Sequence, residues 1–392
     1  RCYRQRQKGF GCRICNYYLC GFCDHFKEKN QLPMDKRQLI SKRGTCDLLP
    51  ENYFITFARE GKMSIWNYNL EYPISEISFN TEVYSPIGLN YFGKKCLLLG
   101  VKNSIKLFDF INNEEIMTLN KHTGLVNRLL LLDSHEEVQA LNLKHSTSED
   151  YDSPMFGEEN KRESEGFRED IRFISSSEDK TILLWTLSGE CSELFKLEHY
   201  YCTGLTKHSS NTIIIGEVKK IYLFDVSEKK VISTWEEHED LIRCFIRIDE
   251  SKFASGGTDS LIKIWDKAKS KSMKTLRHHS STIMRFALIS RNKILVSCSI
   301  DGTIKLYNIQ NFSFVTSLNN HNDAVNDIYS VYNFADNPLF SENSSMFLSC
   351  GSDCFIINWE FSHNKCRIIG KYKADNQFCY ILPLSCFTNN RK

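Results

Sequence analysis

Residues Phe253–Asp266 read FASGGTDSLIKIWD, and this stretch decides the fold because the chain repeats it. Close copies are LVSCSIDGTIKLYN at Leu295–Asn308, FISSSEDKTILLWT at Phe173–Thr186 and FLSCGSDCFIINWE at Phe347–Glu360, and weaker copies end at Asn67, Asp109 and Asp225. A pattern that returns at a fixed period marks a supersecondary unit that cannot bury its own apolar face, so the copies must stack. We therefore expect function to reside on a surface rather than in a catalytic pocket.

The aromatic residue that closes each copy sets the period. These residues are Trp66, Phe108, Trp185, Phe224, Trp265, Tyr307 and Trp359, at steps of 42, 77, 39, 41, 42 and 52 residues. Four steps lie near forty and two contain insertions, which gives seven units. Within a unit, apolar and polar residues alternate between Gly, Asp and Ser turns, a pattern typical of about four short β-strands.

The units resemble WD repeats, the building blocks of a seven-bladed β-propeller, over nearly all of Cys46–Leu384. WD repeats also carry a His some 25–28 residues before the closing aromatic. His238 lies 27 residues before Trp265, His279 lies 28 before Tyr307, and His199 lies 25 before Phe224. His321 and His122 lie farther from Trp359 and Trp185, as the two insertions require. The resemblance implies an all-β fold, a seven-bladed WD-repeat β-propeller.

The resemblance also implies a hydrogen-bond relay in which a turn Asp binds the His, the His binds a strand Ser, and the Ser binds the Trp indole. The expected sets are Asp259, His238, Ser255 and Trp265; Asp353, His321, Ser349 and Trp359; Asp179, His122, Ser175 and Trp185; and Asp301, His279 and Ser297, with Tyr307 in place of Trp. We interpret these residues as structural and expect no catalytic residue among them. The first, second and fourth units lack the turn Asp, which predicts less rigid blades whose Lys- and Arg-bearing turns are available for contacts.

Bulk composition narrows the class of protein. The chain has 392 residues, 41% of them hydrophobic, and a net charge of +2, which excludes a globally basic nucleic-acid binder. No apolar run approaches the roughly 18 residues of a membrane span, so we expect a soluble protein. Cysteines scattered singly through the repeats are typical of small buried hydrophobes in a reducing compartment. We expect a cytoplasmic protein, with a nuclear or a cytoskeletal location as the alternatives.

Two insertions interrupt the repeats. Residues Ser134–Asp170 carry eleven Asp and Glu against four Lys and Arg, a net −7, with few large apolar residues. This composition predicts a loosely ordered loop. A smaller insertion, Tyr332–Ser345, occupies the equivalent connection of the seventh unit, which places both at the same rim. The alternatives are a loop that docks a partner or is phosphorylated, since Ser146, Thr147 and Ser148 lie beside two acidic residues, and a tolerated surface insertion.

The amino-terminal segment is a candidate metal site. Cys12 and Cys15 form one Cys-x-x-Cys pair, and Cys20 and Cys23 form a second pair after four residues. Such pairs aim thiolates at a tetrahedral ion, so we expect structural Zn²⁺; a fortuitous reduced cluster and a redox dithiol are the alternatives. The block resembles part of a ZZ-type or related cross-brace zinc finger, although one spacing is a residue shorter. Eleven Lys and Arg against three Asp and Glu in Arg1–Thr45, a net +8, would offset the thiolate charge.

These features predict a domain order. Residues 1–30 form a zinc-binding module, 31–45 a linker, 46–384 the propeller with the insertion loop 134–170, and 385–392 a tail. The favoured function is a non-enzymatic scaffold whose propeller rims bind other proteins. The alternative is the substrate-recognition component of a ubiquitin ligase, with the zinc module recruiting the conjugating machinery. Neither a membrane nor a small-molecule substrate is expected as a partner, and a nucleic-acid-binding finger is the least favoured alternative.

Overall fold

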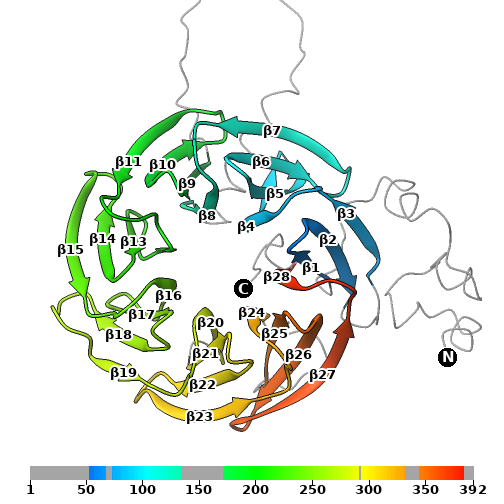
Figure 1. The fold of residues 1–392 in the computed structure, drawn as a ribbon, viewed down its shortest axis with the longest axis vertical. Helices are drawn as coiled ribbons and strands as arrows, with labels where there is room; N and C mark the ends of the chain where they lie inside the picture. Colours follow the sequence, from blue (N-terminus) through cyan, green and yellow to red (C-terminus); the bar gives the residue numbers. More distant parts are fainter. Residues whose placement is uncertain are drawn as a thin grey trace, which may run out of the picture.

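Seven sheets of four antiparallel strands are arranged radially around a central axis (Figure 1). The structure is a computed structural model and describes residues 53–67, 73–92, 94–133, 171–290, 293–331 and 344–383. All regular elements in these ranges are β-strands. The predicted seven-bladed propeller is confirmed, whereas the predicted zinc module, linker and tail lie outside the described residues. No described helix has the length and apolarity that crossing a membrane would demand.

The first three blades, numbered along the chain, have these strands, from the axis outward. Blade 1 contains β28 (Phe378–Pro383), β1 (Tyr53–Ala58), β2 (Lys62–Asn67) and β3 (Ser75–Ser78). Blade 2 contains β4 (Val83–Tyr91), β5 (Lys94–Val101), β6 (Ser104–Asp109) and β7 (Glu114–Asn120). Blade 3 contains β8 (Val126–Leu131), β9 (Arg172–Ser177), β10 (Thr181–Thr186) and β11 (Cys191–Lys196).

The remaining four blades follow the same order. Blade 4 contains β12 (Gly204–Lys207), β13 (Thr212–Glu217), β14 (Lys220–Asp225) and β15 (Lys230–Glu236). Blade 5 contains β16 (Ile242–Arg247), β17 (Lys252–Gly257), β18 (Ile262–Asp266) and β19 (Lys274–Leu276). Blade 6 contains β20 (Ile283–Ile289), β21 (Ile294–Ser299), β22 (Ile304–Asn308) and β23 (Ser313–Leu318). Blade 7 contains β24 (Val325–Val331), β25 (Ser345–Gly351), β26 (Phe355–Ser362) and β27 (Lys365–Lys373).

The ring closes through its last strand. β28 pairs antiparallel with β1, so the carboxyl-terminal strand is the innermost strand of the amino-terminal blade. The sequence left open whether Cys379–Leu384 or the segment near Cys46–Leu49 supplies this strand, and the structure assigns it to Phe378–Pro383. Asn326 of blade 7 donates to the Phe378 carbonyl oxygen (2.7 Å), and Asp327 accepts from the Ile381 amide (2.9 Å). These bonds hold the closing strand against blade 7.

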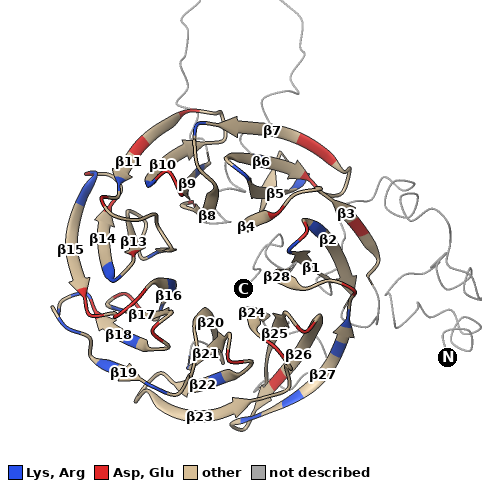
Figure 2. Cartoon of the chain, in the orientation of Figure 1, with Lys and Arg blue, Asp and Glu red and all other residues tan. Residues whose placement is uncertain are grey.

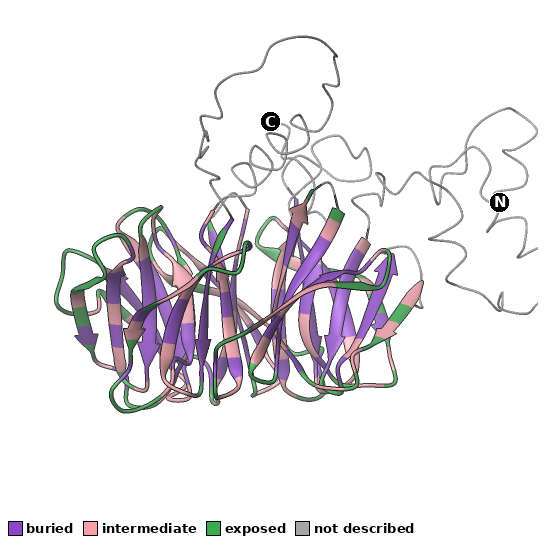
Figure 3. Ribbon diagram, turned by 90° about the horizontal axis from the view of Figure 1, so that it is seen from above, coloured by how far each residue is buried: buried purple, intermediate pink, exposed green. Residues whose placement is uncertain are grey.

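Apolar contacts between blades form the core, and burial concentrates in the strands while the connections at both ends of the ring are exposed (Figure 3). In four blades, a Phe on the second strand faces a Trp on the third strand, and the Trp follows the Phe by twelve residues. The rings are nearly parallel, with centroids 5.9–6.2 Å apart: Phe54 with Trp66, Phe173 with Trp185, Phe253 with Trp265, and Phe347 with Trp359. Truncating such a buried aromatic to Ala costs about 3–5 kcal/mol, which explains why the repeats preserve the pair.

The ring has two distinct faces. We call the face where each inner strand begins the histidine face, because His122, His238, His279 and His321 precede inner strands there. The opposite face, the insertion face, carries the connections from each inner strand to the second strand. The connections that contain residues 134–170 and 332–343 both leave from it, as the sequence predicted for the two insertions. Asp133 and Arg172, on either side of the larger one, form an ion pair of 3.0 Å.

Candidate interaction face

A polar relay in blade 5 holds two loops of the histidine face together. His238 Nδ1 lies 2.7 Å from Asp259 Oδ2, and His238 Nε2 lies 2.6 Å from Ser255 Oγ. The Trp265 indole N–H donates to the same Ser255 oxygen over 2.7 Å. Because the Asp259 carboxylate can only accept, His238 Nδ1 carries a hydrogen and donates it to Asp259. Asp259 also accepts from the amides of Glu239 and Leu261, both at 3.1 Å.

Blades 3 and 7 contain the complete relay as well. His122 contacts Asp179 at 2.9 Å and Ser175 at 2.7 Å, and the Trp185 indole donates to Ser175 over 2.7 Å. The corresponding distances in blade 7, from His321 to Asp353 and Ser349 and from Trp359 to Ser349, are 2.9, 2.8 and 2.8 Å. Burial lowers the pKa of both His122 and His321 below the usual value. The relay residues predicted from the sequence therefore do meet in space.

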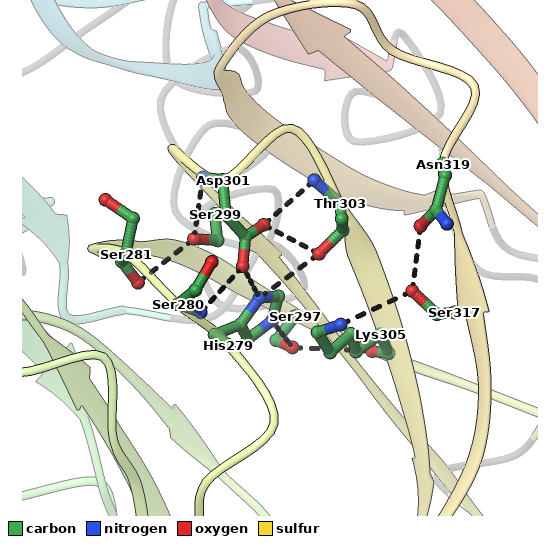
Figure 4. A network of polar contacts seen from close by, with 10 residues as sticks. All are labelled: His279, Ser280, Ser281, Ser297, Ser299, Asp301, Thr303, Lys305, Ser317 and Asn319. Carbon is green, nitrogen blue, oxygen red and sulfur yellow. Dashed lines mark hydrogen bonds and ion pairs between the residues drawn. The ribbon is translucent and has the colours of Figure 1, made fainter.

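Figure 4 shows the relay of blade 6, in which Asp301, His279 and Ser297 are linked. His279 lies 2.8 Å from both Asp301 and Ser297, and Asp301 also accepts from the amide and hydroxyl of Thr303. The Tyr307 hydroxyl, which stands where other blades place an indole, is buried without a hydrogen-bond partner. The sequence identified this last link as the weak one, and the structure agrees.

Blade 4 uses a carboxylate that the sequence interpretation missed. Glu217 is buried and accepts from the amides of His199 and Tyr200, both at 2.8 Å, and from the Tyr222 hydroxyl at 2.8 Å. These hydrogen bonds keep the Glu217 pKa low despite its burial. The turn has no Asp to bind a His ring, as the sequence indicates, but Glu217 holds the preceding loop through its amides instead. The His199 ring, in contrast, is 70% exposed and takes no part in a relay.

Blades 1 and 2 show two other solutions. In blade 1 the Trp66 indole donates to Thr56 over 2.8 Å, so Thr takes the place of the relay Ser. In blade 2 the Lys102 carbonyl accepts from the Val126 amide over 2.7 Å, and the Asn103 amide donates to the His122 carbonyl over 3.4 Å. Both contacts tie the blade 2 turn to blade 3.

The Ser–His–Asp sets have the residue types of a hydrolytic triad but not its accessibility. Ser255, Ser175, Ser297 and Ser349 are fully buried, and in three of these blades an indole donates to the serine oxygen that would have to attack a substrate. A nucleophile must reach a substrate carbonyl with its oxygen free to attack. The arrangement therefore positions loops and does not offer an accessible nucleophile.

The predicted metal ligands Cys12, Cys15, Cys20 and Cys23 lie outside the described residues, so zinc binding stays a prediction, as does the ligase function that depends on it. Within the described ranges, no group of three or more His, Cys, Asp or Glu is placed to hold a metal ion. The described cysteines are free thiols, and Cys96, Cys202, Cys244, Cys298 and Cys350 are buried. Burial raises the pKa of Cys244 to about 12 and that of Cys202 to about 11. They pack as small hydrophobes, as expected from their scatter.

Charge is unevenly distributed around the outer wall. The outermost strand of blade 2, β7, carries Glu114 and Glu115 and no Lys or Arg, whereas the outermost strand of blade 7, β27, carries three Lys and one Arg and no Asp or Glu (Figure 2). Two large apolar side chains are exposed on the histidine face: Ile300 is 45% exposed and Tyr200 is 37% exposed. Each lies in a loop that is held by a buried carboxylate. That face therefore combines rigid loops with exposed apolar side chains.

Comparison with known proteins agrees with this geometry. The family described as "WD domain, G-beta repeat" matches residues 229–266, 270–308 and 312–360, which cover the outer strand of blade 4 and most of blades 5 to 7. The chain is 24% identical over 131 residues to "WD repeat-containing protein 55" of Pongo abelii, covering 32% of this chain and 34% of the relative. It is 27% identical over 114 residues to "p21-activated protein kinase-interacting protein 1-like" of Danio rerio, covering 28% and 31%.

A third relative is the "CCR4-associated factor 4 homolog" of Vanderwaltozyma polyspora, 28% identical over 137 residues that cover 33% of this chain and 20% of the relative. The chain thus matches about a third or less of the length of these relatives. The three matched repeats and the seven-bladed ring together support a WD-repeat propeller.

Proposed function

We propose that this chain is a non-enzymatic scaffold that binds other proteins through its propeller, with the histidine face as the main contact surface. WD-repeat propellers generally bind other proteins, and the matched repeats favour that role here. The observation that carries the proposal is the fixing of turns on this face by buried carboxylates. Asp179, Asp259, Asp301 and Asp353 each accept a loop amide besides the histidine, and Glu217 accepts two loop amides. Loops fixed before binding lose little conformational entropy when a partner docks.

A matched pair of surface variants tests the proposed face. The double variant Ile300→Asp, Tyr200→Asp places two charges on the histidine face, and Ile232→Asp, Phe314→Asp does the same on the outer wall, where the native side chains are 47% and 42% exposed. Each chain is tagged, expressed in cells and purified with its bound proteins. We expect the face variant to lose partners that the native chain and the wall variant retain.

The outcomes separate the parts of the proposal. If all three chains retain the same partners, the histidine face is the wrong surface. If no protein co-purifies with the native chain at stoichiometric amounts, the scaffold role itself is wrong. Thermal unfolding of each variant shows whether a lost partner reflects loss of the fold.

We also propose that Cys12, Cys15, Cys20 and Cys23 hold a structural zinc ion that orders a second docking module. The two Cys-x-x-Cys pairs supply the thiolates that Zn²⁺ prefers. Metal analysis of the intact chain should find about one zinc per chain or more, lost in the variant with all four residues changed to Ser. The variant Cys191→Ser removes a cysteine of the propeller and should retain the metal. A zinc-free native chain would end this part of the proposal and leave the scaffold role intact.

The cytoplasm is the proposed location, because the propeller depends on buried free thiols such as Cys298 and Cys350 and reducing compartments keep thiols in that form. Imaging of the tagged chain tests this. Accumulation in the secretory pathway would contradict it.

A further inference from the structure

The outermost strand of blade 7, β27, has an open edge. It pairs with β26 on one side, and among the described residues no strand pairs with its other side (Figure 1). With nine residues it is the longest of the seven described outermost strands, since the other six have three to seven residues. Alternate residues of an edge strand direct their N–H and C=O groups away from the sheet, where a further extended chain can pair with them.

Two adjacent isoleucines are exposed in the middle of β27. Ile368 is 39% exposed and Ile369 is 38% exposed. The register against β26 shifts between Ile368 and Gly370, so Ile369 is a bulge residue without a partner on β26. This edge therefore offers apolar contact area in addition to its main-chain groups.

The charged residues of β27 are all cations, namely Lys365, Arg367, Lys371 and Lys373. Arg367 is neutralised by an ion pair with Glu360 of β26. The Nζ atom of Lys371 lies over the Phe355 ring, 4.0 Å from its centre. Within the described ranges, no carboxylate forms an ion pair with Lys365, Lys371 or Lys373. Three positive charges along this edge are therefore uncompensated.

The lysines determine which strand this edge can accept. Lysines and bulges on an edge strand commonly prevent it from pairing with another copy of itself. Two β27 strands would place like charges opposite each other, which disfavours their pairing. The same lysines attract a strand that has carboxylates at the facing positions. A second copy of β27 is therefore disfavoured, whereas an acidic strand is favoured.

We propose that β27 binds an extended segment of another protein by edge addition, and that this segment alternates Asp or Glu with apolar residues. In this mode of binding, main-chain hydrogen bonds supply affinity and side chains select the partner. Ile368 and Ile369 contact the apolar residues of the segment, and Lys365 and Lys373, at the two ends of β27, pair with its carboxylates. The surface lies on the outer wall, so the inference does not depend on the histidine face.

Fluorescence anisotropy of the intact chain tests this edge with a labelled nine-residue peptide in which Glu and Val alternate. One control peptide has Lys in place of every Glu. Two further peptides are N-methylated, one at its Glu residues and the other at its Val residues. Because alternate residues of a strand direct their N–H groups to opposite sides, each methylated peptide loses the main-chain donors of one side only.

Three double variants of the chain are compared. The charge variant is Lys365→Glu, Lys373→Glu, in which both native side chains are exposed. Its matched control is Lys269→Glu, Lys271→Glu, which changes two exposed lysines in the β18–β19 connection of blade 5. The apolar variant is Ile368→Ser, Ile369→Ser. Thermal unfolding of each variant measures whether the fold persists, and the charge variant decides the question if the apolar variant unfolds.

We expect the native chain to bind the acidic peptide more tightly than its Lys counterpart. The charge variant should bind the acidic peptide about tenfold more weakly or worse, because two attractive pairs become repulsive. The apolar variant should also bind about tenfold more weakly, since apolar contact area is lost. The blade 5 control should change the affinity less than about twofold, because salt screens charges in a blade that is not adjacent. One methylated peptide should bind about tenfold more weakly than the other.

Several results would overturn the proposal. They are absence of binding by the acidic peptide, equal weakening in the charge variant and its blade 5 control, and equal binding of the two methylated peptides, which indicates charge attraction without edge addition. Tighter binding of a 12-nucleotide single-stranded RNA than of the peptide, lost in the charge variant, would assign the edge to nucleic acid instead. A native dimer in light scattering that the acidic peptide dissociates would assign the edge to a second copy of the chain.

Discussion

Replacing Asp259 by Ala should loosen blade 5 while leaving its apolar core complete. The side chain accepts three hydrogen bonds, from the His238 ring and from two amides, so the substitution leaves the Nδ1–H of a buried imidazole without a partner. An unsatisfied buried donor costs about 1–3 kcal/mol, and each lost amide bond adds at most about 1 kcal/mol where water can replace it. We expect a local loss of about 2–4 kcal/mol.

Hydrogen exchange of the intact chain, followed by mass spectrometry, measures this loss blade by blade. Amides of β16 and β17 that exchange through local opening should exchange about 30-fold to several hundred-fold faster, because each 1.4 kcal/mol corresponds to a factor of ten. Blade 2, across the ring, should be unaffected. The control is Asp240→Ala, which removes an exposed neighbouring carboxylate that accepts from one amide.

Equal exchange of blade 5 in the two variants would refute the reasoning, because the buried relay would then contribute no more than an exposed turn. Faster exchange spread evenly over all blades would also refute it, since the relay would then act on the whole ring and not on its own loops.

Three further outcomes follow from single residues. Tyr307→Phe removes a buried hydroxyl that has no partner, so the melting temperature should stay the same or rise, by an amount equivalent to about 1 kcal/mol; a fall would indicate an unrecognised hydrogen bond. Glu217→Ala should destabilise blade 4 by about 1–3 kcal/mol in the same exchange experiment, with Glu198→Ala, an exposed neighbour, as the inert control. Burial holds the His122 pKa below its unfolded value of about 6.5, so this histidine stabilises the fold fully above that pH. Its contribution to the free energy of unfolding should decline as the pH falls from about 6.5 towards the lower folded pKa. Unfolding measured across this range should therefore show a smaller decrease in stability for His122→Gln than for the native chain.

The fold could be predicted from the sequence because the spacing of residues within each repeat is set by the geometry of one blade. Phe253 and Trp265 face each other across one hairpin, and His238 and Asp259 belong to two loops of one blade, so their spacing is fixed by strand length. The same argument applies to blades 3, 6 and 7. Contacts within one blade can therefore be predicted from a single sequence, including the missing hydrogen bond at Tyr307.

The sequence did not reveal contacts that depend on the length of a side chain. Glu217 stands one position before the usual turn Asp when the blades are aligned on Trp265 and Phe224, and its longer side chain recovers the distance to the loop amides. An acid at a neighbouring position of the turn was the signal that could have identified it. Ring closure was equally hidden, because either Cys379–Leu384 or the segment near Cys46–Leu49 could supply the last strand and no pattern in the sequence decided between them.

The hydrogen bond between Arg128 and the Arg243 carbonyl could not be predicted from the sequence for a different reason. Arg128 and Arg243 are 115 residues apart and lie in blades 3 and 5, which are not neighbours. The Arg128 guanidinium reaches the Arg243 carbonyl because the ring brings the inner strands together and because β8 and β16 each have a bulge near their start. A one-residue change in that bulge would turn Arg128 towards the opposite side of its strand. The repeat explains why the blades are alike, whereas the axis of the ring collects what differs between them: a Gly in blade 4, a Cys in blade 5 and arginines in blades 3 and 6. The repeat pattern predicts the positions that the blades share, so contacts made by inner-strand residues that differ between blades have to be read from the structure.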